Sequence, residues 1–190
     1  ALLRHPGVHY AALLRHPGPQ QHLLDVSCQR LRQLQEKDPT AAGLVVASNI
    51  SHAEDIADCL KQMGQTVCLV TSQTEGAHAR LEAFRYGHTS WIISVNMVSE
   101  GIDIPRLQVC CYLSHVRTEQ YFRQVLGRII RRRHAQDDAC YFYALNESTL
   151  RHYAYRLFDD LPDEHAAIQL DPFSSPTTPA PIVYPATDSI

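Results

Sequence analysis

A short arginine-rich stretch holds the residues of this chain whose types and spacing are best suited to chemistry. The segment Tyr121–Arg133 contains the pattern Q-x-x-G-R-x-x-R, formed by Gln124, Gly127, Arg128 and Arg131. In a helix, residues three and four apart lie on one face, so these four would line a ridge. Guanidinium groups bind phosphate oxygens in pairs, and the glycine lets another surface approach. The pattern favours binding of a polyanion such as a triphosphate, and an arginine cluster on a solvated helix face is the alternative.

A second candidate follows an apolar run, in the segment Asn96–Pro105. Gly101 lies between Glu100 and Asp103, which indicates a loop that needs an unhindered backbone. The carboxylate of Asp103 can accept hydrogen bonds from ribose hydroxyls or from an arginine. The alternative is that Asp103 closes a turn before the proline, a common role for aspartate.

The composition limits the classes of protein to consider. A chain of 190 residues, 45% hydrophobic and 19% charged, is one domain or one domain with appendages. The formal net charge is -3, so a nucleic-acid site must be local. None of the six cysteines forms a C-x-x-C pair and no histidine spacing suits a metal, so we predict no metal site. The absence of a signal peptide and of a long apolar run favours a reduced protein of the cytoplasm, or of the nucleus in a eukaryote, with no membrane partner.

The elements that must position these residues alternate between helix and strand. Apolar periodicity predicts helices at residues 20–36, 51–64, 77–86, 118–133 and 150–161, and strands at 43–47, 66–70, 91–95, 109–113 and 139–144. Ser51 and Glu54 form a capping-box pattern at the start of the second helix, and Thr118 is the expected cap of the fourth. Short continuous apolar runs between helices indicate an α/β fold with a parallel sheet flanked by helices.

The two ends of the chain differ from this regular middle. Residues 1–19 carry a short repeat, A-L-L-R-H-P-G, whose His-Pro-Gly elements predict turns. We expect a linker or poorly defined segment there, one α/β domain at residues 20–165, and a Pro/Ser/Thr-rich tail at 166–190.

The motifs, taken together, resemble those of a known family. The strand followed by S-V-N-M-V-S-E-G-I-D-I-P and then Y-F-R-Q-V-L-G-R-I-I-R-R resembles motifs V and VI of the superfamily-two helicases and translocases. The segment Gly43–Leu60 resembles their motif IV. The similarity covers roughly residues 40–146, with the motifs in order, and is strongest to the branch of type III restriction-like and DEAD/DEAH-related enzymes.

The resemblance implies the second, C-terminal RecA-like lobe of an ATP-dependent helicase or translocase. In this family, ATP with Mg²⁺ lies between two lobes, and the first lobe brings the phosphate-binding loop. By position, Arg131 matches the finger arginine, Arg128 its companion, and Gln124 the residue that helps to orient the γ-phosphate, with Gly127 beside them. Glu100, Gly101 and Asp103 match the motif V residues near the ribose and the interlobe network.

The resemblance also implies partners. These are the N-terminal RecA-like lobe of the same protein and a nucleic acid, DNA or RNA, held mainly through its phosphates. The candidate contacts, at the carboxyl ends of strands, are Ser48, Asn49, Thr71, Ser72 and Asn96. Each of them could instead cap a helix or shape a turn.

Two departures from the family pattern bear on activity. The 190 residues contain no G-x-x-x-x-G-K-[ST] loop and no D-E-x-[DH] motif, so we expect this chain alone to be inactive as an ATPase. The alternative function is a stand-alone, non-catalytic lobe that binds nucleic acid or another protein.

Overall fold

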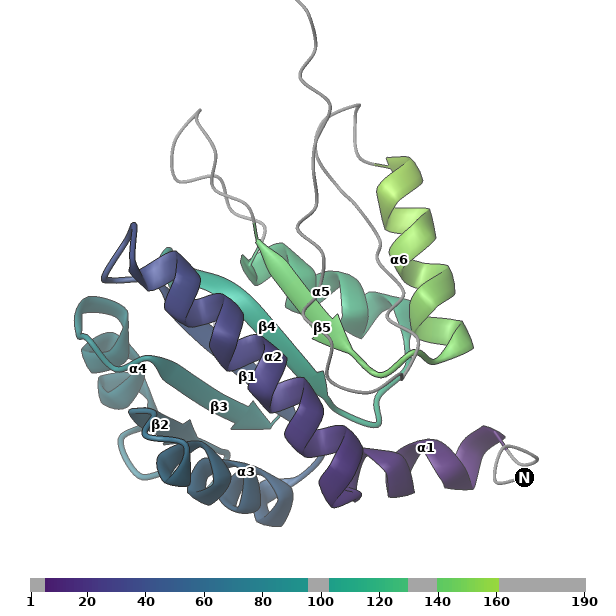
Figure 1. The fold of residues 1–190 in the computed structure, drawn as a ribbon, viewed down its shortest axis with the longest axis horizontal. Coiled ribbons are helices and arrows are strands. Elements are labelled where there is room, and N and C mark those ends of the chain that lie inside the picture. Colours follow the sequence, from purple (N-terminus) through teal and green to yellow (C-terminus); the bar gives the residue numbers. More distant parts are fainter. Residues whose placement is uncertain (1–5, 96–102, 130–139, 161–190) are drawn as a thin grey trace, which may run out of the picture.

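The computed structural model describes residues 6–95, 103–129 and 140–160, without the side chains of residues 6–9, 128–129 and 158–160. Helices and strands alternate through most of this part of the chain (Figure 1). Their order and bounds are α1 Pro6–Arg15, α2 Pro17–Gln35, β1 Ala42–Ala47, α3 Ile50–Gln62, β2 Val67–Val70, α4 Ala77–Tyr86, β3 Trp91–Val95, β4 Leu107–Leu113, α5 Glu119–Ile129, β5 Tyr141–Ala144 and α6 Ser148–Asp160.

The five strands form one parallel sheet in the order β2-β3-β1-β4-β5. Helices α2 and α3 cover one face of the sheet, and α4 and α5 cover the other (Figure 1), as right-handed crossovers between parallel strands require. Helix α6 packs against α5. This arrangement confirms the predicted α/β fold, a RecA-like parallel sheet flanked by helices.

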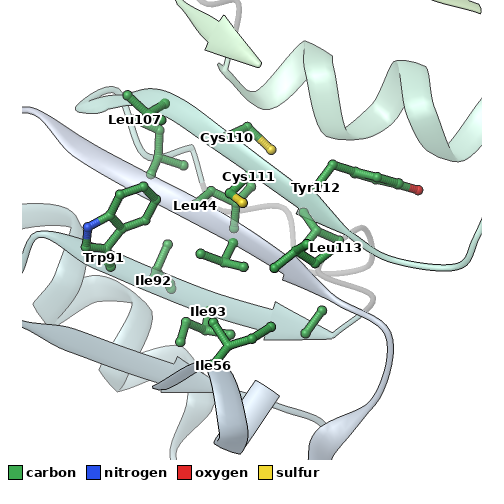
Figure 2. Packing of buried hydrophobic residues seen from close by; sticks show 14 of the residues in the cluster. Leu44, Ile56, Trp91, Ile92, Ile93, Leu107, Cys110, Cys111, Tyr112 and Leu113 are labelled. Carbon is green, nitrogen blue, oxygen red and sulfur yellow. The ribbon is translucent and has the colours of Figure 1, made fainter. Parts of the chain in front are cut away.

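The burial of the strands explains why their sequences are continuous apolar runs. Every residue of β1 and β4 is buried, because these central strands have helices on both faces. The edge strands β2 and β5 are mostly half-buried. Figure 2 shows Leu44 of β1 with side chains from β3 and β4 on either side of it.

A glycine in β1 makes room for the largest side chain of the core. Gly43 is paired with Trp91 across the β1–β3 ladder, and a Cβ added at Gly43 would lie 2.2 Å from Cζ3 of the indole ring. The ring is completely buried, and its Nε1 donates to Oε1 of Gln65 at 3.2 Å. The side chain of Trp91 therefore covers the backbone of β1, which only a glycine at position 43 permits.

A buried arginine joins two loops and the last turn of α4 near the amino ends of the strands. Arg106 is 3% exposed, and its guanidinium lies 4.1 Å from the centre of the Phe84 ring. Its guanidinium nitrogens donate to three backbone carbonyl oxygens, those of Phe84 at 2.9 Å, Thr40 at 3.0 Å and Thr89 at 2.6 Å. These hydrogen bonds satisfy backbone carbonyls that lie outside the sheet, and no sequence pattern indicated them.

The structure corrects two expectations about helix ends. The predicted capping box at Ser51 is wrong, because the N-cap of α3 is Asn49, whose Oδ1 accepts from the backbone N–H of His52 at 2.9 Å. The turn expected near His16 is a bend between two helices, since His16 caps α2 and the chain before it forms α1.

The N-terminal segment is therefore helical from Pro6 rather than a simple linker. Tyr10 and Leu14 of α1 are buried in the core, and α1 extends from α2 past the carboxyl ends of the strands (Figure 1). The proposed division into domains at residues 19 and 165 stays a prediction. Within the described residues, no helix is both long and apolar enough to cross a membrane.

Candidate functional site

Helix α5 carries the described part of the arginine-rich pattern on its exposed side. Phe122, Val125 and Leu126 are buried, whereas Gln124 and Gly127 are exposed. A Cβ added at Gly127 would meet no described atom within 4 Å. The strong segregation of apolar and polar residues makes one side of α5 part of the core and leaves the other accessible.

The two arginines of the pattern are only partly placed. Arg128 belongs to α5, but its side chain lies outside the described residues, and so does the whole of Arg131. The structure thus places Gln124 and Gly127 on one exposed helix side, as the spacing predicted. The catalytic roles assigned to Gln124, Arg128 and Arg131 stay predictions.

The start of α5 is held firmly in place. Oγ1 of Thr118 accepts from the backbone N–H of Tyr121 at 3.4 Å, which agrees with the predicted cap. Glu119 binds two arginines, Arg123 on its own helix at 2.9 Å and Arg156 of α6 at 2.7 Å. A carboxylate in the first turn also complements the helix dipole.

The motif V segment is described only at its end. Asn96, Glu100 and Gly101 lie outside the described residues, while Asp103 is half-buried and is followed by the buried Ile104. The segment leaves the carboxyl end of β3, which is level with that of β1 because Val95 pairs with Ala47 at the end of the ladder. Asp103 comes four residues before β4 begins at Leu107, and its predicted place near the ribose stays a prediction.

The polar residues that follow β1 have structural partners. Oγ of Ser48 donates to the carbonyl oxygen of Leu113 at 2.8 Å, which joins the ends of β1 and β4. Oδ1 of Asn49 caps α3 and also accepts from the guanidinium of Arg15 at 3.2 Å. Both side chains thus have the local roles that were the alternative to nucleic-acid contact.

The residues that follow β2 include two threonines with local roles and one exposed serine. Oγ1 of Thr71 accepts from the N–H of Gln73 at 3.3 Å, and Oγ1 of Thr74 accepts from the N–H of Thr71 at 2.9 Å, so both threonines shape the turn. Ser72 is exposed in the same turn. The sheet order separates this turn from the end of β1 by the single strand β3, so the described nucleic-acid candidates share one edge of the sheet.

Sequence reasoning missed His52, a buried histidine next to these candidates. Its Nδ1 accepts from the N–H of Ser48 at 3.3 Å, so its Nε2 carries the proton and donates to Oε1 of Gln20 at 3.0 Å. Burial and then the charge of Arg15 lower the pKa of His52 from 6.5 to about 4. Its spacing from Ile56 and Leu60 on the apolar side of α3 was the available signal.

An open cavity of about 640 Å³ lies between the start of α2 and the side of α3. Its lining includes Arg15, Gln20, His52 and Asp55, and none of the predicted site residues. The site predicted from sequence is thus a surface on α5 and on the strand ends rather than this cavity.

Comparison with known proteins shows the family. The model of the helicase conserved C-terminal domain matches residues 25–133, more than half of the chain, and the chain belongs to this family. The fold and motifs are those of a superfamily-two helicase C-terminal domain, which confirms the resemblance drawn from motifs IV, V and VI.

Two curated relatives are much longer than this chain. An uncharacterized protein of Mycobacterium leprae is 40% identical over 121 residues, which is 63% of this chain and 20% of that protein. UvrABC system protein B of Chlamydia trachomatis is 32% identical over 126 residues, 63% of this chain and 18% of that protein. The chain spans about a fifth of the length of these relatives.

Solved structures agree on the fold. The E. coli DEAD-box protein SrmB superposes with a TM-score of 0.52 at 14% identity, over 77% of this chain and 92% of that one. S. cerevisiae Dbp5, bound to RNA and ADP BeF3, superposes with a TM-score of 0.55 at 13% identity, over 77% of this chain and 37% of that one. At such identities the similarity shows the RecA-like fold alone.

Proposed function

We propose that this chain is the second lobe of an ATP-dependent nucleic-acid helicase or translocase. The exposed side of α5 is the observation that carries the proposal. Gln124 and Gly127 are exposed there, and no described atom would lie within 4 Å of a Cβ added at the glycine, while the opposite side of the helix is packed into the core. An exposed surface that the core holds this rigidly suits a ligand that another lobe presents to it.

The residue types on this side of α5 fit a nucleotide triphosphate. The amide of Gln124 and the guanidinium groups of Arg128 and Arg131 are donors, which suit phosphate oxygens rather than a metal ion. ATP with Mg²⁺, bound mainly by a first lobe, supplies the γ-phosphoryl group and part of the neutralising charge. In this proposal Arg131 stabilises charge on the transferring phosphoryl group, which is worth roughly 10³–10⁵ in rate.

Further residues complete the proposed nucleotide side. Arg128 holds the phosphate oxygens beside Arg131, and Gln124 orients the attacking water or the interlobe contact. Glu100, Gly101 and Asp103 bind near the ribose and the interlobe network. The phosphate-binding loop comes from the first lobe, so the 190 residues alone hydrolyse no ATP.

The nucleic acid, DNA or RNA, lies across the carboxyl ends of the strands in this proposal. Ser72 and Asn49 are the exposed candidates in the described part of the chain, and Asn96 is the candidate that follows β3 in the sequence. Ser48, Asn49 and Thr71 contribute by shaping the strand ends, since their side chains already have partners. The fold relative Dbp5, solved with RNA and ADP BeF3, supports both kinds of ligand for a lobe of this fold.

The test is Arg131→Ala in the full-length protein that contains this chain. We expect ATP turnover to fall by roughly 10³-fold or more, while nucleic-acid affinity stays within about threefold, a change of less than about 0.7 kcal/mol. Arg133→Ala, two residues away and outside the Q-x-x-G-R-x-x-R pattern, is the matched control and keeps normal turnover. Normal turnover of Arg131→Ala would overturn the proposal and leave the non-catalytic lobe as the better explanation.

A further inference from the structure

The loop between β4 and α5 contains an arginine with contacts to two helices, α1 and α6. Arg117 lies directly before Thr118, the cap of α5. Nη1 of Arg117 binds Oε1 of Glu147, at the start of α6, at 3.2 Å. The guanidinium carbon lies 5.3 Å from the centre of the ring of Tyr10 in α1. The backbone carbonyl of Arg117 accepts from the hydroxyl of Tyr153 in α6 at 3.2 Å.

The partner carboxylate is fixed independently of the arginine. Oε2 of Glu147 accepts from the backbone N–H groups of Thr149 at 2.9 Å and Leu150 at 3.0 Å, so Glu147 caps α6. Burial raises the pKa of Glu147, but these hydrogen bonds and the charge of Arg117 outweigh burial, and the pKa falls below its ordinary value. The arginine therefore meets an ionised, immobile carboxylate.

The contact with Tyr10 links the loop to α1. Tyr10 is 4% exposed, and Leu14, one turn later in α1, is completely buried. Both side chains thus fasten α1 to the core. The stacking of Arg117 on Tyr10 joins α1 to the loop that enters α5.

We propose that Arg117 is a positioning residue that sets the direction of α5 against α1 and α6. The inference rests on the proposed function, because the direction of α5 affects turnover only if the exposed side of this helix meets the nucleotide. Arg117 adjoins the N-cap, so a change in its contacts acts on α5 at its first turn. The ion pair of Glu119 with Arg156 of α6 also fixes this first turn.

A small change in the direction of α5 is sufficient to lower the rate of ATP hydrolysis. Helix α5 has 11 residues and is therefore roughly 16 Å long, so a tilt of about 4° at its start moves its far end by about 1 Å. A misplacement of about 1 Å in a group that acts on the reacting atoms can cost roughly 100-fold in rate. Arg117 thus affects turnover without touching the nucleotide.

The test compares two arginines with similar surroundings in the full-length protein. Arg85 of α4 also pairs with a carboxylate, Glu82 at 3.7 Å, and stacks on a tyrosine ring, Tyr86 at 5.2 Å. Its side chain is 31% exposed, against 29% for Arg117. We expect Arg117→Met to lower the kcat of ATP hydrolysis by roughly 10- to 100-fold with KM within about threefold, and Arg85→Met to leave both unchanged.

The conservative variant separates positioning from general stability. Arg117→Lys keeps a cation opposite Glu147, so we expect it to restore kcat to within about fivefold. Tyr10→Leu keeps an apolar side chain in the core and removes the ring next to Arg117, and it carries the test if Arg117→Met folds poorly. A lowered kcat in folded Tyr10→Leu supports the coupling of α1 to α5, and an unchanged kcat overturns it.

Failure of this inference is distinguishable from failure of the proposed function. If Arg131→Ala abolishes turnover while folded Arg117→Met keeps normal kcat, only the role of Arg117 is refuted. An equal fall in kcat for Arg85→Met would also refute it. Normal turnover in Arg131→Ala refutes the proposed function, and with it the reason for positioning α5.

Discussion

His52 makes the free energy of unfolding depend on pH in a window that can be calculated. The imidazole is 1% exposed, and its pKa is about 4 in the folded protein against an ordinary value of 6.5. In the unfolded chain the residue binds a proton as the pH falls below 6.5, whereas in the folded protein it does so only near pH 4. The unfolded state therefore binds more protons in between, and stability falls as the pH decreases through this window.

The size of the effect follows from the two pKa values. A pKa difference of one unit corresponds to about 1.4 kcal/mol, so the full effect is about 3 kcal/mol below pH 4. Between pH 7.5 and pH 5, the expected loss from His52 alone is about 2 kcal/mol. Burial of the imidazole is the main cause of the lowered pKa, followed by the charge of Arg15. In addition, a second proton, on Nδ1, would face the N–H of Ser48, which now donates to that atom.

The assay is urea unfolding of the 190-residue chain at a series of pH values from 7.5 to 5. His52→Gln removes the titrating group, so its free energy of unfolding is lower at pH 7.5 but declines less steeply with acid, by about 2 kcal/mol over this range. His78→Gln, at an exposed position on α4, is the matched control and keeps the wild-type slope. An identical pH dependence in His52→Gln and in the wild type would refute the reasoning.

Two further predictions concern the packing of the lobe. Gly43→Ala forces a Cβ to within 2.2 Å of the Trp91 ring, so we expect about 1–3 kcal/mol of destabilisation in urea unfolding; the cost should shrink when Trp91→Leu is added, and an additive double variant would contradict this explanation. Arg106→Met removes the buried donor of three backbone carbonyls, two in loops and one in the last turn of α4, so we expect at least about 3 kcal/mol of destabilisation. Arg151→Met, at an exposed position on α6, is the control, and equal effects of the two variants would contradict the proposed role of Arg106.

The arrangement of helices and strands was largely readable from the sequence because its causes are local. Residues 77–86 and 91–95 have the predicted bounds, since Gly87 ends the helix and a continuous apolar run makes the strand. The start of β4 was missed by two residues, because the polar Gln108 interrupts the apolar run, whereas Leu107 before it pairs with Ala42 of β1 across a register shift. The cap of α3 was misassigned because Asn49 and Ser51 are both suitable residues, and only the fold shows which one adopts the cap conformation.

The candidate functional residues also differ in how well the sequence predicted their surroundings. The motif placed Gln124 and Gly127 on one side of a helix, and the structure leaves that side exposed. By contrast, Ser48 and Asn49 were candidates for nucleic-acid contact from their position alone. Their partners, Leu113 and Arg15, are far away in the sequence, so sequence proximity could not indicate them.

The sequence by itself determined the class of the domain, because apolar periodicity and short motifs are local properties of the chain. Only the tertiary structure decided the sheet order, the docking of α1 and the contacts of Arg106 and Arg117. These features depend on side chains that meet across non-consecutive elements, as Arg117 meets Tyr10 and Glu147. Such meetings follow from how the whole chain packs its core rather than from the preferences of any one segment.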